Sequence, residues 1–128
     1  MASVFIYVSK KPSMSLEDFK AYYETKHVPL LHKLIFSHSD ASPVLYYARN
    51  YHDRRANLVD PIAAAGQGQK EYLDFDCLSI LKFKTLEDVQ KTMAIYQEPE
   101  VSRVITDDEE QFADRSLLKM FIVEECVS

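Results

Sequence analysis

The chain has 128 residues, of which 47% are hydrophobic, 27% are charged and only two are glycine, and its net charge is −5. This length predicts a single domain over residues 1–128, with no apolar run near the roughly 18 residues that a membrane-spanning helix needs. A Rossmann fingerprint needs more than two glycines, and Gly66 and Gly68 are the only ones in the chain, so the sequence excludes the nucleotide-binding loops of the Rossmann and Walker types. Nucleic-acid binding needs a basic stripe, and its absence excludes that class as well.

Cysteine and histidine usage gives no sign of a metal site. Cys77 and Cys126 form neither a disulfide framework nor a zinc motif, and they favour a reducing, cytoplasmic setting. At the N-terminus, the basic residues follow the apolar stretch, which is the reverse of a secretory signal. The histidines show no familiar metal-ligand spacing with carboxylates, so we expect no metal; they are His27, His32, His38 and His52.

The first third of the chain predicts a strand followed by a helix. Residues Ser3–Ser9 are β-branched and aromatic, which favours a buried strand. Ser15 is a typical N-cap, and apolar residues then recur at helical spacing as far as Leu34. Pro29 falls inside this stripe and lacks a backbone N–H, so we expect a kink or break near His27.

The remaining chain predicts three more strands and two more helices. Turn residues bound a long segment at about 53–70, and loops of this length are usually lids, binding loops or disordered. Its Gly66 and Gly68 mark a candidate lid. The other expected elements are strands at Val44–Tyr51, within Tyr72–Phe83 and at Leu117–Val123, a helix from the Thr85 cap to about Ile95, and a helix from Pro99 through Ile105 toward Phe112.

This order of elements predicts an α+β fold of the ferredoxin-like βαββαβ type. Such a fold has a four-stranded antiparallel sheet with its helices on one face. Nothing in 128 residues remains to cover the second face of the sheet. We therefore expect a homodimer that forms through this open face.

Two segments resemble the EthD-domain family. The first is Ser15-Leu16-Glu17-Asp18-Phe19 followed by Tyr22-Tyr23-Glu24-Thr25-Lys26-His27-Val28-Pro29-Leu30, and the second is Asp108-Glu109-Glu110-Gln111-Phe112-Ala113-Asp114 with Glu124-Glu125 after the last strand. The resemblance implies a dimeric α+β barrel and a cofactor-free protein. Within the family, the chain looks most similar to fungal polyketide-pathway decarboxylases, which implies a lyase of secondary metabolism.

His27 is the expected catalytic residue. Decarboxylation of a polyketide-type carboxylic acid leaves an enolate, which needs a donor for its oxyanion and a proton for its carbon. Imidazole titrates near neutrality, and Tyr23 lies one helical turn before His27 on the same stripe. The alternative is a core histidine that donates to a carbonyl freed by Pro29.

Strand residues supply further candidates. Tyr46 and Tyr47 point to opposite faces, so one of them is expected in the cavity, and Tyr47 joins the catalytic set. Tyr7 is expected to bind substrate, although most aromatic strand residues are simply core. Arg49 shares the parity of Tyr47 and is expected to bind a substrate carboxylate, with a surface arginine as the alternative.

Acidic residues and one phenylalanine complete the expected substrate-binding set. Asp108 and Glu109 are expected either as structural caps or as partners that orient a histidine. The alternative is that they simply belong to a solvent-exposed helix face. Asp76 lies between apolar neighbours on a strand, where a carboxylate either points outward or has its pKa raised by burial. Phe19 comes from the first family segment.

The sequence leaves the reaction open. Decarboxylation, dehydration and cyclisation all fit a histidine in an apolar slot. A haem-associated or quinol-oxidising barrel of the same fold is a second possibility, and a non-catalytic binding, stress or degradation accessory protein is a third. For the cofactor-free enzyme, the expected partner is a small-molecule substrate.

Overall fold

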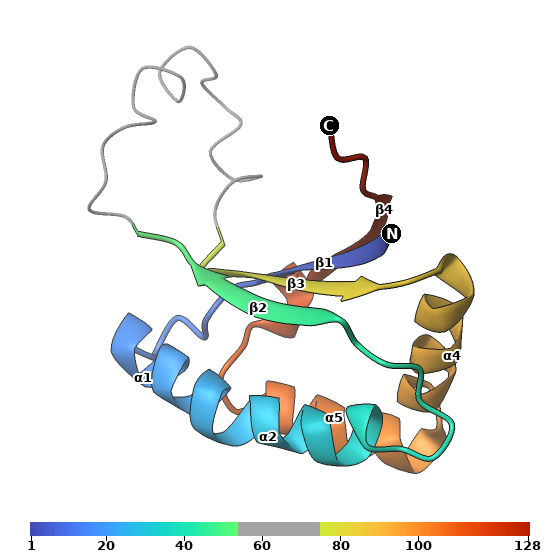
Figure 1. Ribbon diagram of the computed structural model, residues 1–128. Coiled ribbons are helices and arrows are strands. Elements are labelled where there is room, and N and C mark those ends of the chain that lie inside the picture. The colour runs from blue at the N-terminus through green and yellow to red at the C-terminus, as the bar shows by residue number, and fades with distance from the viewer. Residues whose placement is uncertain (54–74) are drawn as a thin grey trace.

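A four-stranded antiparallel sheet forms the frame of the protein. The computed structural model describes residues 1–53 and 75–128. In these residues the strands β1 (Ala2–Val8), β2 (Tyr46–Tyr51), β3 (Cys77–Phe83) and β4 (Lys119–Glu124) lie in the order β2-β3-β1-β4, and every neighbouring pair is antiparallel. The helices lie on one face of the sheet (Figure 1). The predicted α+β fold is therefore confirmed.

Side-chain caps begin two of the helices, as predicted. The Ser15 hydroxyl accepts a hydrogen bond from the Asp18 N–H at 3.1 Å and starts helix α1 (Leu16–Tyr22). The Thr85 hydroxyl accepts from the Asp88 N–H at 3.1 Å and starts helix α4 (Leu86–Tyr96). Helix α5 (Pro99–Glu109) begins with a proline, whose missing N–H is not needed in the first turn.

Of the kink or break predicted near His27, the break is wrong, because the helix continues past Pro29. The chain runs from α1 through a π-helical turn, η1 (Tyr23–His27), into α2 (Val28–Leu31) and a second π-helical turn, η2 (His32–Phe36). The Val28 N–H donates to the Tyr23 carbonyl five residues back, and the backbone angles stay right-handed helical. The wider turn therefore takes the place of a break.

Strand alternation separates a covered face from an uncovered one. On the helix side, the alternate β3 residues Cys77, Ser79, Leu81 and Phe83 are buried. On the other side, Phe5 of β1 lies opposite residues of both neighbouring strands, and its β4 partner Phe121 is 52% exposed. Apolar side chains thus lie on the face that carries no described helix.

The last strand starts later than predicted, and most of the predicted loop lies outside the described residues. The last strand begins at Lys119, because a 3₁₀ turn, η4 (Arg115–Leu117), precedes it, with the Asp114 side chain accepting from the Ser116 N–H at 3.1 Å. Except for Asp53, the predicted loop at 53–70 lies outside the described residues, and so does the candidate lid with Gly66 and Gly68. None of the described helices has the length and apolar character to cross a bilayer.

Candidate functional site

A cavity of about 270 Å³ lies between the inner face of the sheet and the helices. Aliphatic and aromatic residues from β1, β3, α4 and the helical stretch 16–36 form most of its wall. A few polar side chains interrupt this apolar wall, and they are Tyr23, His27, Tyr47, Thr92, Tyr96, Glu109 and Arg115. A mostly apolar cavity with few polar groups is typical of a small-molecule site.

His27 and Asp108 form a hydrogen-bonded pair at this cavity. The His27 Nδ1 lies 2.9 Å from Oδ2 of Asp108, and the His27 side chain is 5% exposed. A carboxylate only accepts, so Nδ1 carries the proton and Nε2 is the free nitrogen of the neutral ring. Among residues 1–53 and 75–128, Nε2 has no hydrogen-bond partner. Because the partner of Nδ1 is a carboxylate, His27 does not donate to a carbonyl freed by Pro29.

Tyr22 holds the second oxygen of the same carboxylate. Its hydroxyl donates to Oδ1 of Asp108 at 2.7 Å. Burial and this hydrogen bond raise the pKa of Tyr22 to about 12, so the phenol remains a donor at neutral pH. Asp108 is thus fixed by Tyr22, which precedes the π-helical turn, and by His27, which ends it. This geometry fits a partner that orients His27 rather than a structural cap.

Tyr23 and Tyr47 are two of the three tyrosines in the described wall of the cavity. The Tyr23 hydroxyl lies 2.6 Å from the Ser79 hydroxyl, and its ring meets the His27 ring edge-on at 5.5 Å between centroids. Burial raises the pKa of both tyrosines well above the ordinary value. Both phenols therefore stay protonated and can donate hydrogen bonds.

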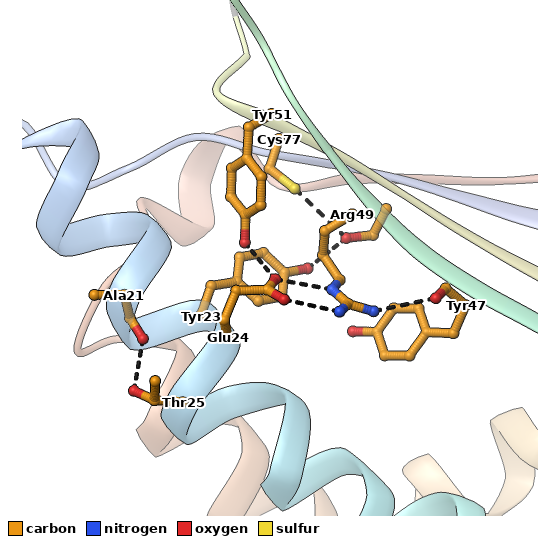
Figure 2. Close-up of polar contacts among 9 residues, drawn as sticks. Ala21, Tyr23, Glu24, Thr25, Tyr47, Arg49, Tyr51 and Cys77 are labelled. Carbon is orange, nitrogen blue, oxygen red and sulfur yellow. Dashed lines mark hydrogen bonds and ion pairs between the residues drawn. The ribbon is translucent and has the colours of Figure 1, made fainter.

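Arg49 bonds to the protein itself through all three of its side-chain nitrogens (Figure 2). Its Nε and Nη2 donate to the two oxygens of Glu24 at 2.9 and 2.8 Å, and Nη1 donates to the Tyr47 carbonyl at 3.1 Å. The guanidinium also stacks over the Tyr47 ring at 4.6 Å. Tyr51 donates to the same Glu24 carboxylate at 2.6 Å. Arg49 does not line the cavity, and its donors are used by internal partners rather than left for a substrate carboxylate.

A second polar group of the cavity centres on Glu109. The Tyr96 hydroxyl donates to Oε1 of Glu109 at 3.2 Å, and the Nε of Arg115 lies 3.4 Å from the same oxygen. Burial raises the pKa of Glu109, while His27, Arg115 and Tyr96 partly offset this effect. Glu109 was predicted for the site, but Tyr96 and Arg115 were not. The only local signal for Arg115 is its place directly after the acidic family segment.

Three further predicted site residues lie outside the cavity wall, as Arg49 and Asp108 do. Tyr7 lies opposite Lys119 on the uncovered side of β1 and contacts the rings of Phe75 and Phe121. Asp76 is buried and accepts a hydrogen bond from the Lys10 N–H at 2.8 Å.

The third is Phe19, which is completely buried and packs on Tyr23 and Phe112 as core. Its place in the family segment is accounted for by packing. Within the described ranges, no group of three or more His, Cys, Asp or Glu side chains has an arrangement that could hold a metal ion.

Comparison with known proteins agrees with this architecture. Residues 11–116 match the EthD domain family. A solved structure of an ethyl tert-butyl ether d (ethd) family protein from Bacillus halodurans is similar in fold, with a TM-score of 0.55 and 17% sequence identity over 98% of this chain and 100% of that one. None of the curated proteins matches the chain. The chain belongs to the EthD domain family.

Proposed function

We propose that this protein is a cofactor-independent lyase that decarboxylates a polyketide-type carboxylic acid, with His27 as its acid/base group. The observation that carries the proposal is the His27–Asp108 pair, which leaves one imidazole nitrogen without a partner among the described residues, in a side chain that lines an apolar cavity. A histidine whose second nitrogen is held by a carboxylate is the common arrangement for proton transfer in enzymes.

His27 would supply the proton that decarboxylation requires. When the bond between the α-carbon and the carboxylate of a β-keto acid breaks, carbon dioxide leaves and the electron pair forms an enolate. The Nε2 of His27, which has first taken up a proton from solvent, then donates that proton to the α-carbon, and the ring returns to its neutral form. The Asp108 carboxylate, 2.9 Å from Nδ1, stabilises the charged ring before this transfer.

Tyr47 is the proposed donor to the enolate oxygen. It lines the cavity, and burial keeps its phenol protonated. The Arg49 guanidinium stacks on the ring and bonds to the Tyr47 carbonyl, so the side chain is held in one position. A donor that is fixed in advance in an apolar site stabilises developing negative charge effectively.

The mostly apolar wall of the cavity supports a substrate with an apolar body. The same histidine and phenols would also serve dehydration or cyclisation of a related acid. Placement in polyketide metabolism rests on the family resemblance, and a cytoplasmic setting rests on the two free thiols, Cys77 and Cys126.

Carbon dioxide release from an aromatic β-keto acid tests the reaction directly. Benzoylacetic acid is incubated with the wild type, with His27→Gln and with the control His38→Gln, and spontaneous release is subtracted. His38 lies near Asp40 and Glu98 and does not line the cavity. We expect His27→Gln to lose about 10²-fold or more of the catalysed rate and the control to keep it.

Two outcomes would contradict the proposal. Loss of turnover after treatment with a chelator would count against cofactor independence. Equal activity in the wild type and in a folded His27→Gln variant would remove His27 from the mechanism and favour a binding role.

We also propose that the uncovered face of the sheet forms a homodimer. Its apolar residues include Phe5 and Phe121, which lie opposite each other on neighbouring strands. Phe121 and Tyr46 are about half exposed, at 52% and 47%. Burying such aromatic side chains against a second copy would remove a large apolar area from water.

A further inference from the structure

Arg115 is a cavity residue with unused hydrogen-bond donors. It follows α5, lines the cavity and has a side chain that is 40% exposed, which places it at the cavity entrance. Its Nε faces Glu109 at 3.4 Å. Its two terminal nitrogens, Nη1 and Nη2, have no hydrogen bond or ion pair in the described part of the chain.

The other described arginines differ from Arg115 in this respect. Arg49 uses Nε, Nη1 and Nη2 on Glu24 and on the Tyr47 carbonyl. Arg103 is bonded to Glu100 and Asp107 on the exposed side of α5 and does not line the cavity. Among the arginines that the structure describes, Arg115 alone combines a place in the cavity wall with free terminal nitrogens.

We propose that Arg115 binds the carboxylate of the substrate at the cavity entrance and so selects flat apolar carboxylic acids over neutral molecules of the same shape. The terminal edge of a guanidinium matches a carboxylate with two parallel hydrogen bonds. The apolar body of the acid then fills the cavity. This inference deepens the proposed function and rests on it for the identity of the substrate class.

Glu109 limits how tightly Arg115 holds this carboxylate. It faces the same guanidinium through Oε1, and its own negative charge opposes a second carboxylate nearby. Carbon dioxide can therefore still leave from a bound acid. Replacing Glu109 with glutamine removes that opposition and is expected to tighten the binding of an acid.

A matched pair of unreactive probes tests the proposal by calorimetry. 2-Naphthoate and 2-naphthamide have the same ring system and differ in charge. The wild type is expected to bind naphthoate more tightly than naphthamide. We expect Arg115→Gln to weaken naphthoate binding about tenfold and to leave naphthamide binding unchanged.

Three variants complete the experiment. Arg103→Gln is the matched control and is expected to bind naphthoate like the wild type. Glu109→Gln is expected to bind naphthoate more tightly. Arg115→Lys keeps the charge but not the paired geometry, so its affinity is expected between those of the wild type and Arg115→Gln. Circular dichroism establishes that each variant is folded, and since Arg115 is partly exposed its replacement is compatible with folding.

The proposal is overturned if folded Arg115→Gln binds naphthoate like the wild type, or if it loses both probes equally. It is also overturned if the wild type binds no naphthoate at about 5 mM. Binding and turnover fail separately: Arg115-dependent binding without any carbon dioxide release would refute the proposed reaction and leave the carboxylate site in place.

Discussion

Glu24→Gln provides a test of the polar network beside the cavity that needs no substrate. The substitution keeps the size of the side chain and removes its charge. Glu24 accepts from Arg49 Nε at 2.9 Å, from Arg49 Nη2 at 2.8 Å and from the Tyr51 hydroxyl at 2.6 Å. An amide cannot accept all three bonds, and its own N–H groups would face donors.

The expected loss of stability lies between two limits. Exposed ion pairs contribute about 0.2–1 kcal/mol, whereas breaking a buried pair costs about 3–5 kcal/mol. The Arg49 and Glu24 side chains are 20% and 33% exposed, which is intermediate. We therefore expect Glu24→Gln to lower the free energy of unfolding by about 2 kcal/mol at pH 7, or the melting temperature by about 8 °C.

The effect has a defined pH dependence. The hydrogen bond from Arg49 is the main reason that the pKa of Glu24 lies below its ordinary value of 4.5. The folded state therefore binds this proton less tightly than the unfolded state. The stabilisation is fully present above about pH 4.5 and is lost as the pH falls through the lower pKa of the folded state. The difference between wild type and variant should thus be constant from pH 5 to 7 and shrink below it.

Urea unfolding followed by circular dichroism measures this difference at each pH. Glu100→Gln is the matched control, because Glu100 receives two bonds from Arg103 on an exposed helix face. The control is expected to have no measurable effect. A loss below about 0.5 kcal/mol for Glu24→Gln, or a loss that does not change with pH, would refute the reasoning.

Two further predictions concern the catalytic pair and the dimer. Asp108→Asn is expected to lower kcat by about 10²–10³-fold with little change in KM, because Asp108 bonds to His27 but does not line the cavity. A large change in KM alone would contradict this role. Light scattering is expected to show a dimer of about 30 kDa, twice 14.8 kDa, for the wild type and a monomer for Phe121→Lys. The control Met120→Lys, on the opposite side of β4, should leave the dimer intact. A monomeric wild type would contradict the proposed dimer.

Local chemistry in the sequence was sufficient to predict the elements of the fold. Ser15 and Thr85 cap helices because their hydroxyls reach the third N–H beyond them, and this depends only on neighbours in the chain. The break expected at Pro29 does not form, because a π-helical turn precedes the proline and keeps the chain helical.

The site was harder to predict because its contacts are distant in sequence. His27 and Asp108 are 81 residues apart, and Arg49 and Glu24 are 25 apart. Parity places Arg49 on the correct face of its strand but says nothing about a carboxylate on a neighbouring helix. Glu24 accepts hydrogen bonds from the Arg49 donors that were expected to bind a substrate. The place of Arg115 in the cavity wall likewise depends on packing between distant segments.

The adjacency of Asp108 and Glu109 constrains how this segment can vary in evolution. Consecutive residues of an α-helix point about 100° apart, which lets one contact the His27 Nδ1 while the other enters the cavity. Substitutions at the outer positions of α5 leave this division intact. A one-residue insertion or deletion inside α5 would rotate both carboxylates to the wrong neighbours. Homologues that retain the site should therefore vary in the residues at the outer positions of α5 and keep the length of the helix constant.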